Sequence, residues 1–280
     1  MSHNHMPQHI VITGANTGIG LATAKSLAAQ GHHLIIACRD LHKAATAAEQ
    51  IKQAGAASVD VVKLDLADLA SIKQTVTDIT AIFPQVDVLI NNAGLFNHPY
   101  QSTVQGYESN FGVNVLGPVL LTELLLPTLK AAPQARIINL ASVAHLAGKI
   151  DPTSYQKPAK YRPIAAYGQS KLGNLLYSNA LAQRLKGSTV TSNALHPGAV
   201  NSDIYRTLPR WQKLFVDLVL IPPQTPAKLI TTMATGQEWQ SKNGQYIAIQ
   251  APQYTAKCSR DLAFCQRFEQ EMLNLLKPYL

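Results

Sequence analysis

Tyr167 and Lys171 stand four residues apart, a spacing that places two side chains on one face of a helix, one turn from each other. A phenol has a pKa of about 10, and a neighbouring ammonium group stabilises its ionised form. Bringing that pKa to about 7 takes roughly 4 kcal/mol of differential interaction. Such a pair could transfer protons near neutral pH. Because many amphipathic helices carry Tyr and Lys at this spacing by chance, the rest of the chain must support the chemistry.

Short apolar runs alternate with helical patterns along the chain. Strands are expected at residues 9–12, 33–37, 59–64, 86–90, 136–140, 189–195 and 246–249, separated by helices at 18–30, 41–53, 70–83, a long stretch before Pro127, 166–185 and 260–276. This alternation predicts βαβ units with right-handed crossovers. The expected fold class is α/β: a single-domain, Rossmann-type doubly wound, seven-stranded parallel sheet with helices on both faces. With no internal repeat or clear linker, residues 1–280 are expected to form one domain.

The first expected strand runs into a glycine-rich turn that opens a helix, Thr13-Gly14-Ala15-Asn16-Thr17-Gly18-Ile19-Gly20. Gly14 permits a tight turn, Gly18 the close approach of a pyrophosphate, and Gly20 the close packing of helix on strand. The helix start then offers its free N–H groups and positive dipole end to the phosphates. The spacing differs from the G-x-G-x-x-G of most dinucleotide folds, so the loop alone is an incomplete indication.

Polar residues follow the next strand ends. Dinucleotide folds that bind NAD usually carry an acid after the second strand, but this chain has Cys38-Arg39. The Arg39 guanidinium suits a 2′-phosphate, which favours NADP(H) over NAD(H), unless Arg39 simply pairs with Asp40 on the surface. Asp65, after the third strand, could accept from an adenine amino group or serve as a helix N-cap.

The ordered set of motifs resembles the short-chain dehydrogenase/reductase family over nearly the whole chain. The set comprises the glycine loop at 13–20, Asn91-Asn92-Ala93-Gly94, Ser142, and Tyr167 with Lys171. Within the family, the chain looks most like the retinol dehydrogenase-like branch. The segments that carry this likeness are 37–40 (ACRD), 113–117 (VNVLG), 137–145 (IINLASVAH) and 196–198 (HPG).

The resemblance implies a role for each matching residue. Tyr167 would be the general acid in carbonyl reduction and the base in alcohol oxidation, while Lys171 would lower its pKa and hold the nicotinamide ribose. Ser142 would hydrogen-bond the substrate oxygen, and Asn114 would hold a water that relays protons to Lys171. Two positioned hydroxyls can stabilise charge that develops on a carbonyl oxygen. Without the resemblance, the simpler expectation is that Asn114 forms local hydrogen bonds in its helix and that Ser142 caps a turn.

The loops and the resemblance together predict the cofactor contacts. They are Gly14, Asn16, Thr17, Gly18, Ile19, Gly20, Arg39, Asp65, Leu66, Asn91, Ala93, Gly94, Tyr167, Lys171, Pro197, Gly198, Val200 and Ser202. Residues 197–202 resemble the family's segment over the nicotinamide carboxamide. There Val200 would contribute backbone groups, and Ser202 stands where Thr is commoner.

Two stretches do not fit the alternation, and long irregular insertions in compact domains are often functional. The gap from Ser142 to Tyr167 is 25 residues, roughly twice that of most of the family. Its Tyr155 and Tyr161 either form one wall of the substrate pocket or belong to a surface loop. Residues 200–223 fall where the family has its variable substrate loop. The apolar character of 211–223 suggests a lipophilic substrate or contact with a membrane surface, with core packing as the alternative.

Composition excludes several classes of protein. The chain carries 24 Lys and Arg against 16 Asp and Glu, a net charge of +8, but has no basic run that indicates nucleic acid. Three cysteines without a C-x-x-C pair fit reduced thiols in the cytoplasm, and the His and Cys residues show no metal-site spacing. The start lacks the apolar core of a signal peptide. Residues 113–129 read as a buried helix, because polar residues and prolines interrupt them.

The sequence therefore predicts a cytoplasmic, metal-free, NADP(H)-dependent reductase of a small lipophilic aldehyde or ketone, or a dehydrogenase of the corresponding alcohol. Reduction is favoured because NADPH pools usually drive reductions. The resemblance also allows a homodimer that pairs through the helix bearing Tyr167. The alternative from another class is a protein that binds NADP(H) without turnover, as a sensor or scaffold. Loss of Ser142, Tyr167 or Lys171 would favour that alternative, and all three are present.

Overall fold

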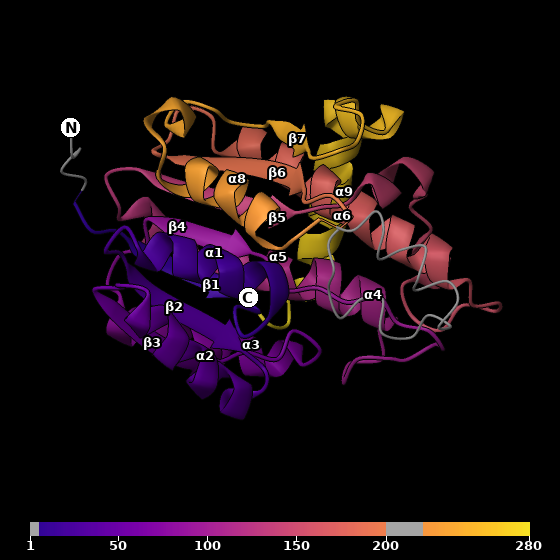
Figure 1. Ribbon diagram of the computed structural model, residues 1–280. Helices are drawn as coiled ribbons and strands as arrows, with labels where there is room; N and C mark the ends of the chain where they lie inside the picture. Colours follow the sequence, from indigo (N-terminus) through magenta and orange to yellow (C-terminus); the bar gives the residue numbers. More distant parts are fainter. Residues whose placement is uncertain (1–5, 200–220) are drawn as a thin grey trace.

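The computed structural model describes residues 6–199 and 221–280. Its sheet has seven parallel strands in the order β3-β2-β1-β4-β5-β6-β7 (Figure 1). The strands are β1 (His9–Thr13), β2 (His33–Cys38), β3 (Ser58–Lys63), β4 (Val88–Asn91), β5 (Ala135–Leu140), β6 (Val190–His196) and β7 (Tyr246–Ala248). The order reverses between β1 and β4, as in doubly wound sheets. The predicted fold class is confirmed.

Helices cover both faces of the sheet (Figure 1). The longer ones are α1 (Gly18–Ala28), α2 (Leu41–Gln53), α3 (Leu69–Ile82), α5 (Gly117–Lys130), α6 (Pro163–Arg184), α8 (Gln224–Thr235) and α9 (Leu262–Leu276). Successive strand residues point to opposite faces. Accordingly, Ile10 and Ile12 pack with α1, α2 and α8 in one core cluster. Val11 and Leu89 pack with α3, α5, α6 and α9 in the other.

The apolar stretch before Pro127 forms a composite helix. A short α4 (Ser109–Phe111) leads through a π-helical turn (Gly112–Leu116) into α5. Within the described residues, Ser109–Lys130 is the one helix long and apolar enough to cross a membrane, and 78% of its most apolar window is buried in the protein. That burial agrees with the prediction of a buried core helix.

Helix α8 has no counterpart among the predicted elements. It begins at Gln224 and carries Pro226 in its first turn, where a proline costs little because those N–H groups have no partner within the helix. Its buried face consists of Ala227, Ile230, Met233 and Ala234, which pack against the α1 side of the sheet. The sequence pattern of this helix is about as amphipathic as that of α2, so the helix could have been predicted.

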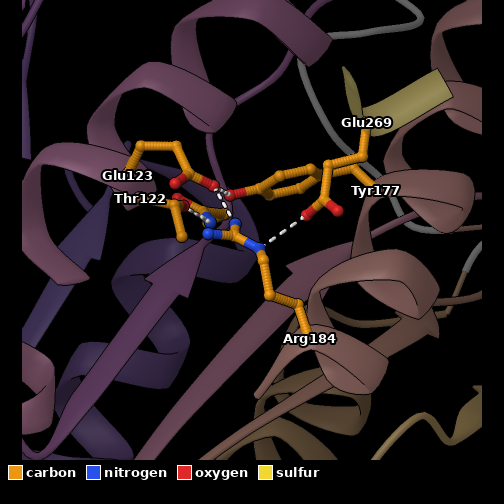
Figure 2. Close-up of polar contacts among 6 residues, drawn as sticks. Thr122, Glu123, Tyr177, Arg184 and Glu269 are labelled. Atoms are coloured by element: carbon orange, nitrogen blue, oxygen red, sulfur yellow. Dashed lines mark hydrogen bonds and ion pairs between the residues drawn. The ribbon is translucent and has the colours of Figure 1, made fainter. Parts of the chain in front are cut away.

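Helix α9 covers α6 and reaches α5 within the same chain. Its apolar side buries Phe268, Met272 and Leu276 in the cluster that also holds α5 and α6. A polar network joins the same three helices (Figure 2): Arg184 of α6 donates to Glu123 of α5 and, over 3.1 Å, to Glu269 of α9. The Tyr177 hydroxyl donates to Glu123 over 2.7 Å. The outer side of α6 is thereby covered by the chain's own last helix.

Candidate active site at the carboxyl edge of the sheet

Parallel strands bring their carboxyl ends to one edge, and ligands of doubly wound folds bind there. At this edge the glycine loop follows β1, residues 92–94 follow β4, Ser142 follows β5, and residues 197–198 follow β6. Helix α6 crosses behind β5 and β6 and brings Tyr167 and Lys171 to the same edge. The residues predicted from separate motifs therefore meet in one place.

The glycine loop has the geometry of a phosphate cradle. Gly14 and Gly18 adopt φ of 67° and 56°, the left-handed region that side chains disfavour. A Cβ on Gly20 would lie 2.5 Å from both the Asn92 Nδ2 and the Gly14 carbonyl oxygen, so only glycine fits. Thr17 is exposed and makes no side-chain capping bond, and the first turn of α1 holds no acid. The free N–H groups of that turn fit the anionic part of a dinucleotide.

Asn92, absent from the predicted contacts, is the residue that fixes this cradle. Its Nδ2 donates to the Thr13 carbonyl over 2.8 Å and to the Gly14 carbonyl over 3.2 Å. The Thr13 hydroxyl oxygen in turn accepts from the backbone N–H groups of Asn92 and Ala93. Asn91, which the motif made a cofactor contact, instead turns its side chain inward and donates to Thr122 and Asn139. The paired asparagines thus have separate tasks.

The end of β2 lies against the glycine loop. Burial raises the pKa of the Cys38 thiol, and the backbone N–H groups of Ala15 and Asn16 only partly offset that effect. Arg39 is exposed beside it. The alternative, an ion pair between Arg39 and Asp40, is not formed. The Asp40 carboxylate instead lies 3.6 Å from the Lys43 ammonium and caps α2 by accepting from the Lys43 N–H.

Asp65 stands one turn before α3. Its carboxylate accepts from the Ala67 N–H over 3.0 Å, whereas the N-cap of α3 is Asp68, which accepts from Ala70. The N-cap interpretation of Asp65 is therefore wrong, because the helix begins three residues later. Leu66 is buried, and its side chain lies where a Cβ on Gly117 would stand.

Tyr167 and Lys171 lie one helical turn apart on α6, as their spacing predicts. The Lys171 Nζ is 5.7 Å from the centre of the Tyr167 ring and donates to the Leu140 carbonyl over 3.0 Å. Lys171 is 6% exposed, and burial lowers its pKa from 10.5 to about 8. Tyr167 is half-buried, and the ring of Phe96 meets its ring edge-on at 5.4 Å. No sequence motif pointed to Phe96, since its position depends on the loop after β4.

Ser142 follows β5 and is the N-cap of a 3₁₀ turn (Val143–Ala147). Its hydroxyl oxygen accepts from the Ala144 N–H over 3.2 Å, so the residue does cap the turn. A hydroxyl that accepts through a lone pair can still donate its hydrogen elsewhere. Turn capping and hydrogen bonding to a substrate oxygen are therefore compatible here.

Asn114 sits in the π-helical turn and holds the loop after β4. Its Oδ1 accepts from the Leu95 N–H over 2.8 Å, and its Nδ2 donates to the Leu95 carbonyl and to Ser170. The residue also lines a narrow cavity of about 10 Å³, together with Leu140, Asn139 and others. That space holds about one water molecule.

The long segment before Tyr167 is anchored in two ways. Tyr155 is 4% exposed and stacks on Phe111 at 4.0 Å, so it belongs to the core and the pocket-wall interpretation is wrong for it. The Tyr161 hydroxyl donates to the Asn97 carbonyl over 2.8 Å and accepts from Asn110. Tyr161 thus ties this segment to the loop that carries Phe96.

The segment after β6 is described only at its start. Gly198 has φ of 85°, and the Ala199 carbonyl accepts from the Ile221 N–H over 2.8 Å. The predicted contacts Val200 and Ser202, and most of the expected substrate loop at 200–223, lie outside the described residues.

Known proteins are similar to this chain in sequence. A family model described as short chain dehydrogenase matches residues 8–213. Retinol dehydrogenase 13 of Mus musculus is 41% identical over 248 residues, 85% of this chain and 74% of that protein. Retinol dehydrogenase 12 of Mus musculus is 48% identical over 198 residues, 70% of this chain. The match covers 63% of that relative, so the chain spans less than two thirds of its length.

Solved structures agree with these relatives. A putative uncharacterized protein from Mycobacterium paratuberculosis is 30% identical with a TM-score of 0.77, over 95% of this chain and 93% of its own. The Pseudomonas aeruginosa RhlG/NADP complex is 27% identical, with a TM-score of 0.70 over 86% and 94%. The 3-ketoacyl-(acyl-carrier-protein) reductase from Brucella melitensis, complexed with NADH, is 26% identical, with a TM-score of 0.69 over 86% and 96%.

This chain belongs to the short-chain dehydrogenase family. The relatives place it in the retinol dehydrogenase-like branch, as its motifs indicated. Membership makes the protein an oxidoreductase that transfers hydride with a nicotinamide cofactor and acts on a small substrate.

Proposed function

We propose that this protein reduces lipophilic aldehydes or ketones with NADPH, and oxidises the corresponding alcohols in the reverse direction. The observation that carries the proposal is the meeting of Ser142, Tyr167 and a buried Lys171 at the open edge of the sheet, beside the glycine cradle. When bound, the nicotinamide supplies the hydride in the reduction. The protein's own groups manage the oxygen and its proton.

In the proposed reaction, Ser142 donates its free hydroxyl hydrogen to the substrate oxygen, and Tyr167 donates a proton to the same atom. Lys171 holds its positive charge within one helical turn of the phenol, which favours the phenolate left behind. Because the pKa of Lys171 is about 8, the ammonium form dominates at neutral pH. Asn114 keeps the loop after β4 in place, and the cavity beside it can hold the water that restores protons to Lys171.

The preference for NADPH is inferred from the end of β2. An acid there would accept from a ribose 2′-hydroxyl, but it would repel a 2′-phosphate. Cys38 is buried and its neighbour Arg39 offers an exposed guanidinium, which pairs well with a phosphate. The solved relatives include complexes with NADP and with NADH, so the choice of cofactor depends on this chain's own residues.

The lipophilic substrate is inferred from the surroundings of Tyr167. Phe96 presents an aromatic ring at the phenol, and the loop that carries it is tied down by Tyr161 and Asn114. A rigid apolar wall beside the reacting oxygen favours an apolar substrate body. The relatives are retinol dehydrogenases by name, and a retinoid aldehyde belongs to the proposed class.

A panel of carbonyl compounds with NADPH and NADH, scored by absorbance at 340 nm, tests the proposal. It should contain retinal, medium-chain aldehydes, an aromatic ketone and a polar sugar aldehyde. The expected result is turnover of the apolar compounds, with NADPH preferred. If NADPH binds tightly and no carbonyl or alcohol turns over, the protein is a cofactor-binding sensor or scaffold and the proposal fails.

A further inference from the structure

His145 is fully buried, and its side chain bonds the backbone of Ser142. The His145 Nδ1 lies 2.6 Å from the Ser142 carbonyl oxygen. The backbone N–H of His145 donates to the same oxygen over 3.0 Å. A carbonyl oxygen can only accept, so Nδ1 must carry the proton. Burial lowers the pKa of His145, which fits a neutral ring. The Ser142 carbonyl is thus held by two donors from one residue.

The other nitrogen of His145 faces a polar space. Its Nε2 has no hydrogen-bond partner among the described residues, and the same is true of the His196 Nδ1 and the Tyr246 hydroxyl, all buried atoms. The rings of His145 and Tyr246 meet edge-on at 5.0 Å. Tyr246 pairs with Ala194, and His196 lies two residues further along β6, so both side chains point to the α6 side of the sheet.

Buried polar atoms are nearly always hydrogen-bonded, and where the protein offers no partner an ordered water commonly takes that place. A neutral His145 with its proton on Nδ1 needs a donor at Nε2. Because the Tyr246 hydroxyl does not bond to His145 directly, a water held between His145, Tyr246 and His196 is the donor that fits. Burial also lowers the pKa of His196 to about 4, helped by His145 and Lys171, so this second ring is neutral as well. His196 and Tyr246 therefore offer His145 a neutral, polar surrounding in which a bound water can complete the hydrogen bonds.

We infer that His145 is a positioning residue for Ser142, held in one tautomer by the polar space that it shares with Tyr246 and His196. The inference rests on the proposed role of Ser142 toward the substrate oxygen. Without the imidazole, the Ser142 carbonyl keeps one donor, and the turn that aims its hydroxyl loses a constraint. Small misplacements of catalytic groups are costly, so we expect kcat to fall by roughly tenfold or more.

Two substitutions separate positioning from packing. His145→Leu fills the space but donates nothing, whereas His145→Asn keeps an amide N–H near the place of Nδ1. For a carbonyl that the wild type reduces, we expect kcat to fall at least tenfold in His145→Leu and to recover largely in His145→Asn. The Kd for NADPH should stay within about twofold of wild type in both. Equal loss in the two variants, or wild-type kcat in His145→Leu, would overturn the inference.

The tautomer can be read in the unmodified protein, whatever its activity. Nitrogen-15 NMR at pH 7 should show a neutral His145 ring with the hydrogen on Nδ1, assigned by its absence from His145→Asn. A hydrogen on Nε2 would exclude the bond to Ser142 and refute the inference, even if the wild type reduces carbonyls. An inactive wild type would instead refute the proposed function, and the tautomer would still decide whether His145 holds the Ser142 turn.

Discussion

Lys171→Met should stabilise the protein while it abolishes turnover. The Lys171 ammonium is 6% exposed, and burial lowers its pKa from 10.5 to about 8. That difference corresponds to about 3 kcal/mol against the charged form in the folded state. Methionine has a similar length and no charge, so the variant escapes this cost. Losing the hydrogen bond to the Leu140 carbonyl offsets about 1 kcal/mol of this gain, because Asn174 still donates to that carbonyl. With an unfolding entropy of about 0.6 kcal/mol per degree for a chain of this size, the melting temperature at pH 7 should rise by roughly 3 °C.

The pH dependence isolates this effect from other consequences of the substitution. Between about pH 8 and 10.5 the unfolded chain binds one proton more than the folded chain at this site, so wild-type stability rises with pH there. Below pH 8 the full cost is present. The advantage of Lys171→Met should therefore be largest below pH 8 and shrink toward pH 10.5.

Thermal and urea unfolding of the cofactor-free protein at pH 6.5, 8 and 10 would measure the effect. Lys186→Met is the matched control, since Lys186 is exposed just beyond the same helix and should show no pH-dependent gain. If Lys171→Met is less stable than wild type by the same amount at every pH, the ammonium is not strained by burial. The account of Lys171 as a buried charge kept for catalysis would then be refuted.

Three further substitutions or measurements test other parts of the site. Arg39→Ala should weaken NADPH binding at least tenfold and leave NADH unchanged by calorimetry; equal effects would remove the 2′-phosphate role. Gly20→Ala should destabilise the fold by about 1–3 kcal/mol and weaken the binding of NADPH and NADH alike, because the added Cβ would lie 2.5 Å from Asn92 and from the Gly14 carbonyl. Unchanged cofactor binding would show that the loop can shift. Light scattering should find a monomer, because α9 covers α6 within the chain; a dimer of the unmodified protein would contradict this.

The fold was predictable because short, largely apolar runs alternate with helical stretches along the chain, even though α1 and α6 themselves have only a weak amphipathic pattern. Seven strands in alternation with helices leave few topologies open. Helix α8 was missed although its sequence is clearly amphipathic, with Ala227, Ile230 and Ala234 on the buried face. The start of α3 was predicted to within one residue, but Asp65 was considered as its cap because Asp65 and Asp68 are both chemically suited to that role, and only the backbone decides between them.

The spacing alone predicted that Tyr167 and Lys171 lie on one face of a helix, whereas their proposed role in proton transfer was suggested by the resemblance to the family. Asn92, Phe96 and His145 were not predictable, because each acts through a contact with a distant part of the chain or with a loop whose course the sequence does not dictate. Tyr155 shows the converse. As an aromatic residue in an irregular segment, Tyr155 was interpreted as part of a pocket wall, but it stacks on Phe111 in the core.

The central claim is that Tyr167 gives and takes the proton of the reacting oxygen. Tyr167→Phe keeps the ring that meets Phe96 and removes only the hydroxyl. Turnover of the best carbonyl with NADPH should fall by a factor of about 10² to 10⁴ or below detection, while NADPH still binds by fluorescence or calorimetry. A variant that reduces the carbonyl at the wild-type rate would contradict the mechanism.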